Sequence, residues 1–162
     1  PTVADLVGEA AGRVWPVGRL DMDSEGLLLL TDDGALTHAL LHPRHAVEKE
    51  YLVWVTGYRP GAEQARAKPM PRDGQPLHPA KVRLLGQGEG RARLSGVIHE
   101  GKNRQIRRMC KELGYHVQEL KRVRIMNIRL GHLKTGGLRN VTDQELEELL
   151  ELLQTDNTET ED

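Results

Sequence analysis

Residues 18–34 read GRLDMDSEGLLLLTDDG and contain the clearest local pattern in the chain. The first half is a polar loop that begins at Gly18 and carries one arginine and three acidic residues. The apolar run Leu27–Leu30 follows directly and ends at a turn signal, so we predict a buried strand over residues 27–31. The polar loop is therefore held by a rigid element, which is where functional side chains are commonly found.

The rest of the chain contains more strand signals than helix signals. Strands are predicted at 14–17, 48–56, 81–85 and 91–99, with extended chain over 116–128. Helices are predicted at 35–41, 60–68 and 103–113, and a capping box at 142–145 opens a last one. Strands with irregularly interspersed helices indicate an α+β fold, with a mixed, mainly antiparallel sheet and flanking helices.

Two of the predicted helices have informative faces. The helix at 103–113 has an apolar face of Ile106, Met109, Cys110 and Leu113. Its opposite face consists of Arg104, Arg108 and Lys111, with Arg107 at the flank. In the last helix, the leucines at 146, 149, 150 and 153 predict a core-facing stripe. The polar, acidic residues 155–162 that follow predict a disordered tail.

The formal net charge of −1 hides a strong segregation of charge. Residues 143–162 contain nine acids and no base, whereas residues 1–142 contain 15 acids and all 23 bases. Between residues 99 and 129 there are nine bases and three acids. A basic surface of this kind indicates nucleic-acid binding, and a salt-bridged, solvated face explains the charges equally well.

Composition also excludes several classes of protein. No apolar run approaches the roughly 20 residues of a membrane span, and no signal-peptide pattern is present. Cys110 is the only cysteine, so no internal disulfide can form and a reducing, cytoplasmic location is expected. The sequence begins at Pro1 without a methionine, so we expect it to be part of a longer protein.

The acidic loop by itself allows three interpretations. Asp21, Asp23, Glu25, Gly26 and Asp32 fall at relative positions 1, 3, 5, 6 and 12, close to the spacing of an EF-hand calcium loop. The strand predicted after the loop disagrees with the helix that an EF-hand requires there. An ordinary acidic turn between two strands is the second interpretation, and a catalytic carboxylate at Asp21 is the third.

A family resemblance favours the third interpretation. Residues 18–34 resemble the signature loop of the pseudouridine synthases, in the RsuA/RluB-type branch that modifies ribosomal RNA. EKEYLVWVTG at 48–57 resembles the second motif of the family, and HEGKNRQIRRMCKELG at 99–114 resembles the third. GHLKTGGLRNVTDQELEELLELL at 131–153 resembles its usual C-terminal end. Four motifs in order, from about Pro1 to about Leu153, are far more specific than any one of them.

The resemblance implies roles for individual residues. Asp21 matches the catalytic aspartate, Arg19 an arginine associated with the flipped-out nucleotide, and Tyr51 a tyrosine that stacks on the target base. Arg107 matches an arginine that pairs with the catalytic aspartate, and Ile106 an apolar residue that lines the pocket. The basic residues expected to contact RNA are Lys49, Lys102, Arg104, Arg108 and Lys111.

The implied chemistry explains these residue types. Making pseudouridine breaks the N1–C1′ bond, turns the base and forms a C5–C1′ bond. A carboxylate beside the sugar can act as nucleophile, stabilise a cationic sugar or take a sugar proton. A neighbouring arginine keeps that carboxylate ionised where burial would raise its pKa. We expect no cofactor and no metal, because no step requires them and the sequence has no phosphate-binding loop and no Cys/His metal spacing.

The resemblance implies a monomeric catalytic domain over residues 1–154 that acts on ribosomal RNA, and KNRQIRRM favours the large subunit. Family members usually carry an RNA-binding domain and a further strand before the position of Pro1, so we expect this chain to lack both. Two other function classes stay open. One is a non-catalytic RNA-binding or ribosome-associated module that uses the basic helix. The other is a metal-dependent phosphodiesterase that uses Asp21, Asp23, Asp32 and Asp33 and loses activity with chelator.

Overall fold

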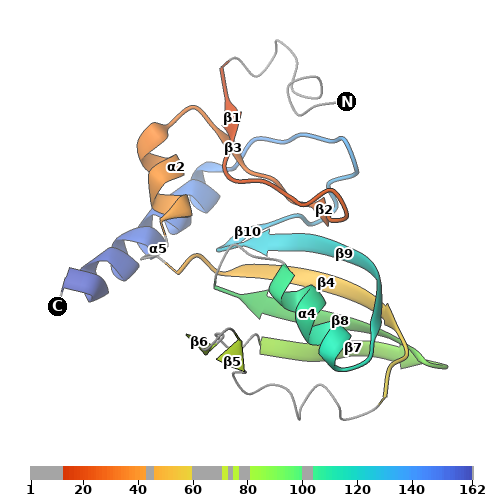
Figure 1. Cartoon of the computed structure of the whole chain (residues 1–162). Coiled ribbons are helices and arrows are strands. Elements are labelled where there is room, and N and C mark those ends of the chain that lie inside the picture. Colours follow the sequence, from red (N-terminus) through yellow and green to blue (C-terminus); the bar gives the residue numbers. More distant parts are fainter. Residues whose placement is uncertain are drawn as a thin grey trace.

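The computed structural model describes residues 13–42, 46–59, 71–72, 75–76, 81–99 and 104–161. Its main feature is a six-stranded sheet in the order β10-β9-β4-β8-β7, with β2 beside β9 (Figure 1). These strands are β2 (Glu25–Gly26), β4 (Lys49–Thr56), β7 (Lys81–Gly88), β8 (Arg91–Ile98), β9 (His116–Ile125) and β10 (Ile128–Arg129). The described pairings are antiparallel except that of β2 with β9. The predicted α+β fold with a mixed, mainly antiparallel sheet is confirmed.

The segment 27–31 departs from the predicted single strand. Only β3 (Leu30–Thr31) is a strand there, and it pairs with β1 (Trp15–Pro16), whereas Glu25–Gly26 pairs with β9. The two pairings belong to different sheets, and Gly26, with a φ of +117°, lies where the chain leaves the pairing with β9. Leu27 is buried as predicted. A further short pair, β5 (Pro71–Arg72) with β6 (Gln75–Pro76), stands apart from the main sheet.

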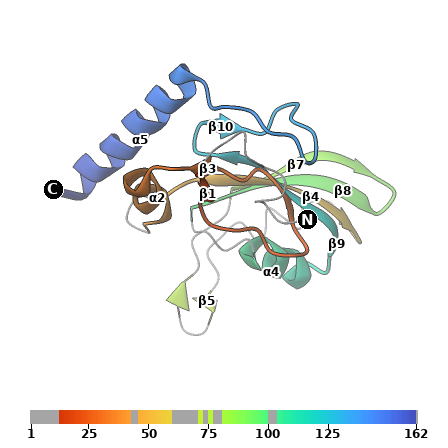
Figure 2. The same ribbon diagram turned by 90° about the horizontal axis from the view of Figure 1, so that it is seen from above.

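The described helices are α2 (Gly34–Leu41), α4 (Arg104–Glu112) and α5 (Asp143–Glu161). Helix α4 lies across one face of the sheet, and α2 and α5 lie together at the side of β10 (Figures 1 and 2). Asp33 caps α2, because its carboxylate accepts from the backbone N–H groups of Ala35 and Leu36 at 2.9 and 3.1 Å. The helix predicted at 60–68 lies outside the described residues.

Helix α5 begins at the predicted capping box. Thr142 Oγ1 accepts from the Glu145 backbone N–H at 3.1 Å, and Glu145 Oε1 accepts from the Thr142 N–H at 2.9 Å. The predicted leucine stripe is only half right. Leu149 and Leu153, one turn apart, are buried, while Leu146 and Leu150 are 40% and 44% exposed because only a narrow face of the helix meets the core. The tail predicted as disordered continues this helix to Glu161.

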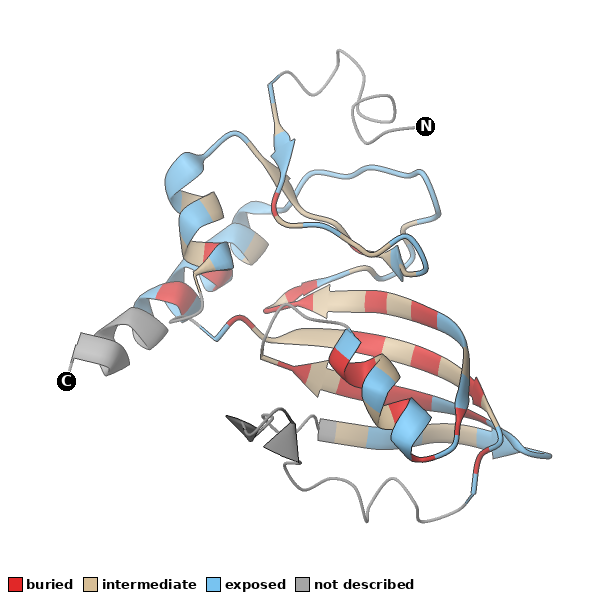
Figure 3. Cartoon of the chain, in the orientation of Figure 1, coloured by how far each residue is buried: buried red, intermediate tan, exposed pale blue. Residues whose placement is uncertain are grey.

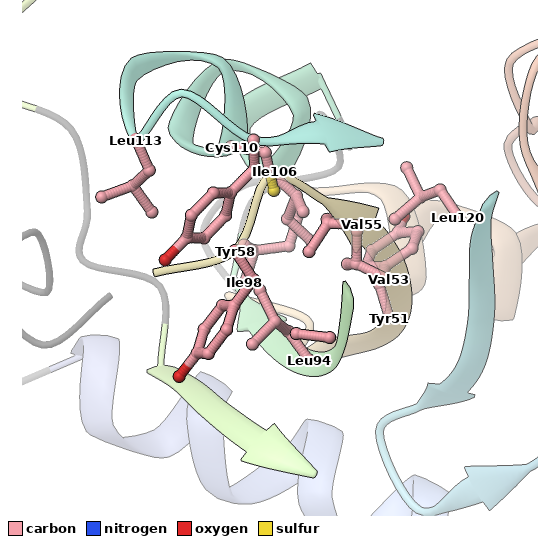
Figure 4. Close-up of a cluster of buried hydrophobic side chains, with 12 residues drawn as sticks. Tyr51, Val53, Val55, Tyr58, Leu94, Ile98, Ile106, Cys110, Leu113 and Leu120 are labelled. Carbon is pink, nitrogen blue, oxygen red and sulfur yellow. The ribbon is translucent and has the colours of Figure 1, made fainter. Parts of the chain in front are cut away.

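Two clusters of buried apolar side chains hold the layers together (Figure 3). The first lies between the sheet and α4, and strand β4 contributes the alternating residues Tyr51, Val53 and Val55 (Figure 4). Cys110 is part of it, and burial raises the pKa of its thiol to about 11, which confirms it as a core residue. The second cluster joins α2 and α5 to the turn between β9 and β10. No helix in the described ranges is both long and apolar enough to cross a membrane.

Candidate active site

The loop that carries Asp21 is fastened to β9 at its C-terminal end. Gly26 lies opposite Arg122 in the parallel β2–β9 pair, and the Leu27 N–H donates to the Arg122 carbonyl at 2.8 Å. A Cβ at residue 26 would overlap the backbone of Arg122. The φ of +117° at this residue also favours glycine. The close approach of the two backbones therefore depends on Gly26.

Asp21 lies where this loop meets the start of α4. Its side chain is 23% exposed, and its Oδ2 atom lies 3.3 Å from Nε of Arg104. This oxygen is buried, and the ion pair does not give it a hydrogen bond. The Ser24 N–H closes the turn by donating to the Asp21 carbonyl at 3.0 Å. A partly buried carboxylate beside a guanidinium, with one oxygen free of hydrogen bonds, can act on a ligand.

The expected pairing of Asp21 with Arg107 is corrected by the structure. Nη2 of Arg107 donates to the Asp23 carbonyl at 2.5 Å and lies 3.6 Å from Asp23 Oδ1. Arg104 takes the place beside Asp21 and also contacts Asp23, with Nη1 3.3 Å from Oδ2. The two arginines are neighbours on successive turns of α4, and the one at the first turn reaches Asp21. Arg104 was expected to contact RNA from the opposite face of this helix.

Tyr51 lies on β4 and is only 1% exposed. Burial raises the pKa of its hydroxyl, the Arg122 guanidinium opposes this through its charge and a hydrogen bond, and the Asp21 carboxylate raises the pKa further. The hydroxyl is thus within the electrostatic reach of both Arg122 and Asp21. Because the ring is covered, a base can stack on it only after neighbouring chain moves aside.

Arg122 is a residue of this site that the sequence analysis did not single out. Its side chain is buried, and Nε donates to the Leu27 carbonyl at 2.9 Å. Lys49 stands on β4 two residues before Tyr51, and its pKa is lowered by burial and by the charge of Arg122. The sequence shows that this part of β9 is rich in basic residues. It does not reveal which basic side chain points into the protein.

The other predicted residues lie elsewhere. Arg19, Arg108 and Lys111 are exposed, the last two on α4. Ile106 is buried in the first core, where its Cδ1 lies under Gly96. Lys102 lies outside the described residues. The structure therefore brings Asp21, Tyr51 and Arg104 together with Lys49 and Arg122, and leaves a separate exposed basic surface on α4.

The described acids do not form a metal centre. No group of three or more His, Cys, Asp or Glu side chains within the described ranges is placed to hold a metal ion. Asp21 and Asp23 face the arginines of α4, and Asp33 caps α2. Of the four acids named for a phosphodiesterase, Asp21 and Asp23 thus lie against α4, Asp33 caps α2 and Asp32 is exposed.

Comparisons with known proteins identify relatives over most of the chain. A family described as RNA pseudouridylate synthase matches residues 7–112. Ribosomal large subunit pseudouridine synthase B of Bacillus subtilis is 36% identical, over 91% of this chain and 62% of that protein. Dual-specificity RNA pseudouridine synthase RluF of Escherichia coli is 38% identical, over 97% of this chain and 53% of that protein. The chain thus spans little more than half the length of these curated relatives.

Solved structures give the same result for the fold. A crystal structure of a pseudouridylate synthase superposes with a TM-score of 0.79 and 34% identity, over 92% of this chain and 65% of that one. An H/ACA ribonucleoprotein bound to a substrate RNA containing 2′-deoxyuridine has a TM-score of 0.57 at 18% identity, over 76% of this chain and 41% of that one. At that identity the second likeness concerns the fold alone.

Proposed function

The chain belongs to the RNA pseudouridylate synthase family, and we therefore propose that it isomerises a uridine of ribosomal RNA to pseudouridine. We take large-subunit RNA as the substrate, because one relative is named for the large ribosomal subunit and the motif at 102–109 favours the same branch. We also propose that the protein acts in the cytoplasm as a monomer, without cofactor or metal.

The position of Asp21 carries this proposal. Its carboxylate stands on a loop anchored by Gly26, is 23% exposed, and lies beside Arg104 and within reach of the Tyr51 hydroxyl. The exposed fraction leaves room for a sugar to approach the carboxylate. The guanidinium of Arg104 places a permanent positive charge beside this carboxylate.

In the proposed reaction the carboxylate of Asp21 faces C1′ of the target ribose. The N1–C1′ bond breaks and its electron pair leaves with the base, while Asp21 attacks C1′ or takes a proton from the sugar. The base turns and C5 forms the new bond to C1′, as the Asp21–C1′ bond breaks or as Asp21 returns the proton to the sugar. C5 then loses its proton to solvent and N1 gains one. The reaction needs no oxidant. The hydrogen of uridine C5 is the atom that the RNA releases, so its release measures the reaction.

RNA binding is assigned to the basic surface of α4. Arg108 and Lys111 are exposed there, and Arg19 is exposed on the Asp21 loop. Lysine and arginine contacts to phosphates supply most of the affinity of such surfaces. The target base must leave its stack, which costs a few kcal/mol. Stacking on Tyr51 would offset roughly 1–3 kcal/mol of this once the residues that cover the ring move aside.

The first experiment measures tritium release from ribosomal RNA transcripts labelled at uridine C5, with chelator present. We expect the wild type to release tritium, Asp21→Asn to lose at least about 1,000-fold of the rate, and both proteins to melt alike. Asp32→Asn is the matched control, since Asp32 is an exposed acid of the same segment. It should retain the wild-type rate.

The alternatives give different results. Release that chelator abolishes would indicate metal-dependent chemistry. RNA binding without release by the wild type, on both large- and small-subunit transcripts, would support the non-catalytic RNA-binding module. Equal rates for the wild type and Asp21→Asn would remove Asp21 from the mechanism while leaving the isomerase assignment intact.

A further inference from the structure

Arg122 is a buried cation without a carboxylate partner among the contacts described for it. Its side chain is 3% exposed, and the ion pairs of the described residues do not include it. Its Nη2 atom is buried and has no hydrogen-bond partner. Burying an unpaired charge destabilises a folded protein, so such a residue calls for a role other than stability.

The first contact of Arg122 is with the exit of the Asp21 loop. Nε donates to the Leu27 carbonyl at 2.9 Å, and the Arg122 carbonyl accepts from the Leu27 N–H at 2.8 Å. Residue 27 is thus held at both of its backbone groups by one residue of β9. The adjoining Gly26 permits the close approach that these two bonds need.

The second contact of Arg122 is with Tyr51. Arg122 lies opposite Tyr51 in the β4–β9 pair, and its positive charge lowers the pKa of the Tyr51 hydroxyl against the effect of burial. The register of β9 shifts between Glu50 and Tyr51, so that Arg124 lies opposite Glu50. This β-bulge separates two arginines that a regular strand would place on one face.

Arg124 shows what a structural arginine on the same strand looks like. Its Nη2 lies 2.6 Å from Glu48 Oε1 and its Nε 2.9 Å from Glu50 Oε1, and Nη1 donates to the Met126 carbonyl at 2.6 Å. All three nitrogens of this guanidinium group therefore have acceptors. Arg122 instead donates to the Leu27 carbonyl and lies opposite Tyr51, two parts of the candidate active site that are 24 residues apart in sequence.

We propose that Arg122 is a positioning residue, which sets the Asp21 loop at a fixed distance from Tyr51 by binding the backbone of Leu27 from a position opposite Tyr51. This rests on the proposed function, in which Asp21 acts at the sugar while Tyr51 meets the base. Arg122 itself is too deeply buried to touch RNA in this structure. Lysine cannot replace it, because an ammonium group lacks the planar guanidinium whose Nε binds the Leu27 carbonyl while Nη2 stays free.

The test compares Arg122→Lys and Arg122→Gln with Arg124→Lys as the matched control. Single-turnover tritium release, RNA dissociation constants and melting temperatures are measured for each. We expect both Arg122 variants to lose about 10–100-fold in rate with RNA affinity within about 3-fold of wild type, because small misplacements of reacting groups cost this much. Arg122→Lys should melt close to the wild type yet fail to rescue the rate. Arg124→Lys should change the rate by less than about 3-fold.

A merely structural role would give another pattern. The rate of Arg122→Lys would then follow its folded fraction and return to the wild-type value at lower temperature. That result would overturn the proposal, as would a wild-type rate in Arg122→Gln.

Hydrogen exchange provides a readout that does not depend on activity. In Arg122→Gln the amides of residues 22–27 should exchange about 10-fold faster than in the wild type, while Arg124→Lys leaves them unchanged. If the wild type releases no tritium, the proposed function fails and this measurement alone decides whether Arg122 holds the loop. Equal exchange in the wild type and Arg122→Gln would overturn that role.

Discussion

Two groups of charged side chains differ in how far their hydrogen bonds are satisfied. One surrounds Arg124 on β4 and β9, and the other is built by the Asp21 loop, α4 and β9. Around Arg124, both Glu48 and Glu50 are bound at 2.6–2.9 Å. In the candidate active site, three buried atoms have no hydrogen-bond partner: Asp21 Oδ2, Arg107 Nε and Arg122 Nη2. Within the described ranges the only other buried atom of this kind is Asn127 Oδ1.

The difference separates charges that stabilise the fold from charges held ready for a ligand. Buried polar groups are nearly always hydrogen-bonded in folded proteins, so a concentration of free donors and acceptors marks a place where another molecule supplies the missing partners. The Arg124 group is complete without a ligand. In the proposed isomerase, a ribose and its base would supply the partners that the Asp21 group lacks.

Gly26→Ala should have the largest effect, because it disturbs the contact between the Asp21 loop and β9. The new Cβ overlaps the Arg122 backbone at a positive φ, so we expect a loss of about 2–5 kcal/mol of unfolding free energy and loss of tritium release. Denaturant melts and the release assay measure the two effects. Gly136→Ala is the matched control, because Gly136 also has a positive φ but has open space around it. It should cost about 1–2 kcal/mol and leave activity unchanged. Equal losses in both variants would contradict the close packing of the loop on β9.

Tyr51→Phe tests the candidate active site without disturbing the packing of the Tyr51 ring. The ring stays in the core, but the hydroxyl that lies near Arg122 and Asp21 is lost. We expect the single-turnover rate to fall about 10–100-fold with little change in melting temperature. Tyr58→Phe removes a hydroxyl from the same core and should keep the wild-type rate. A wild-type rate in Tyr51→Phe would show that the ring alone matters.

Glu145→Gln tests a charged side chain whose hydrogen bonds are satisfied, and it should have the smallest effect. Glu145 binds Arg139 at 2.8 Å and caps α5, and the hydrogen bond from Arg139 lowers its pKa to about 2. The pair therefore adds stability above the ordinary glutamate pKa, and this is lost as the pH falls from about 4 to about 2. We expect a difference below about 1 kcal/mol at pH 7, since the pair lies at the surface, where solvent screens it. Melting curves of both proteins should converge near pH 2, and a difference that persists there would contradict the assignment.

Sequence patterns predicted the locally determined elements well. The capping box at Thr142, the helix over Arg104–Glu112 and the burial of Cys110 are all confirmed. Each depends on side chains that are three or four residues apart, and that spacing is written directly in the chain. The hairpin of β7 and β8 is also local, since a two-residue turn joins its strands.

Predictions that depended on distant partners were less successful. Residues 27–31 form no single strand because Gly26 and Leu30 pair with different strands. The candidate catalytic residue could be named from the loop sequence, but its ion-pair partner could not. Arg104 and Arg107 have the same side chain and lie three residues apart, so only the docking of α4 on the loop decides which one meets Asp21.

The sequence by itself determined the kinds of element, the residues of the loop and the family to which they belong. The tertiary structure alone decided which charges are paired, because that depends on strand register. A one-residue shift in β9 opposite Glu50 and Tyr51 sends Arg124 to two glutamates and Arg122 to Tyr51. Side-chain direction alternates with every residue of a strand, so a single bulge reassigns both arginines without changing the composition of the strand.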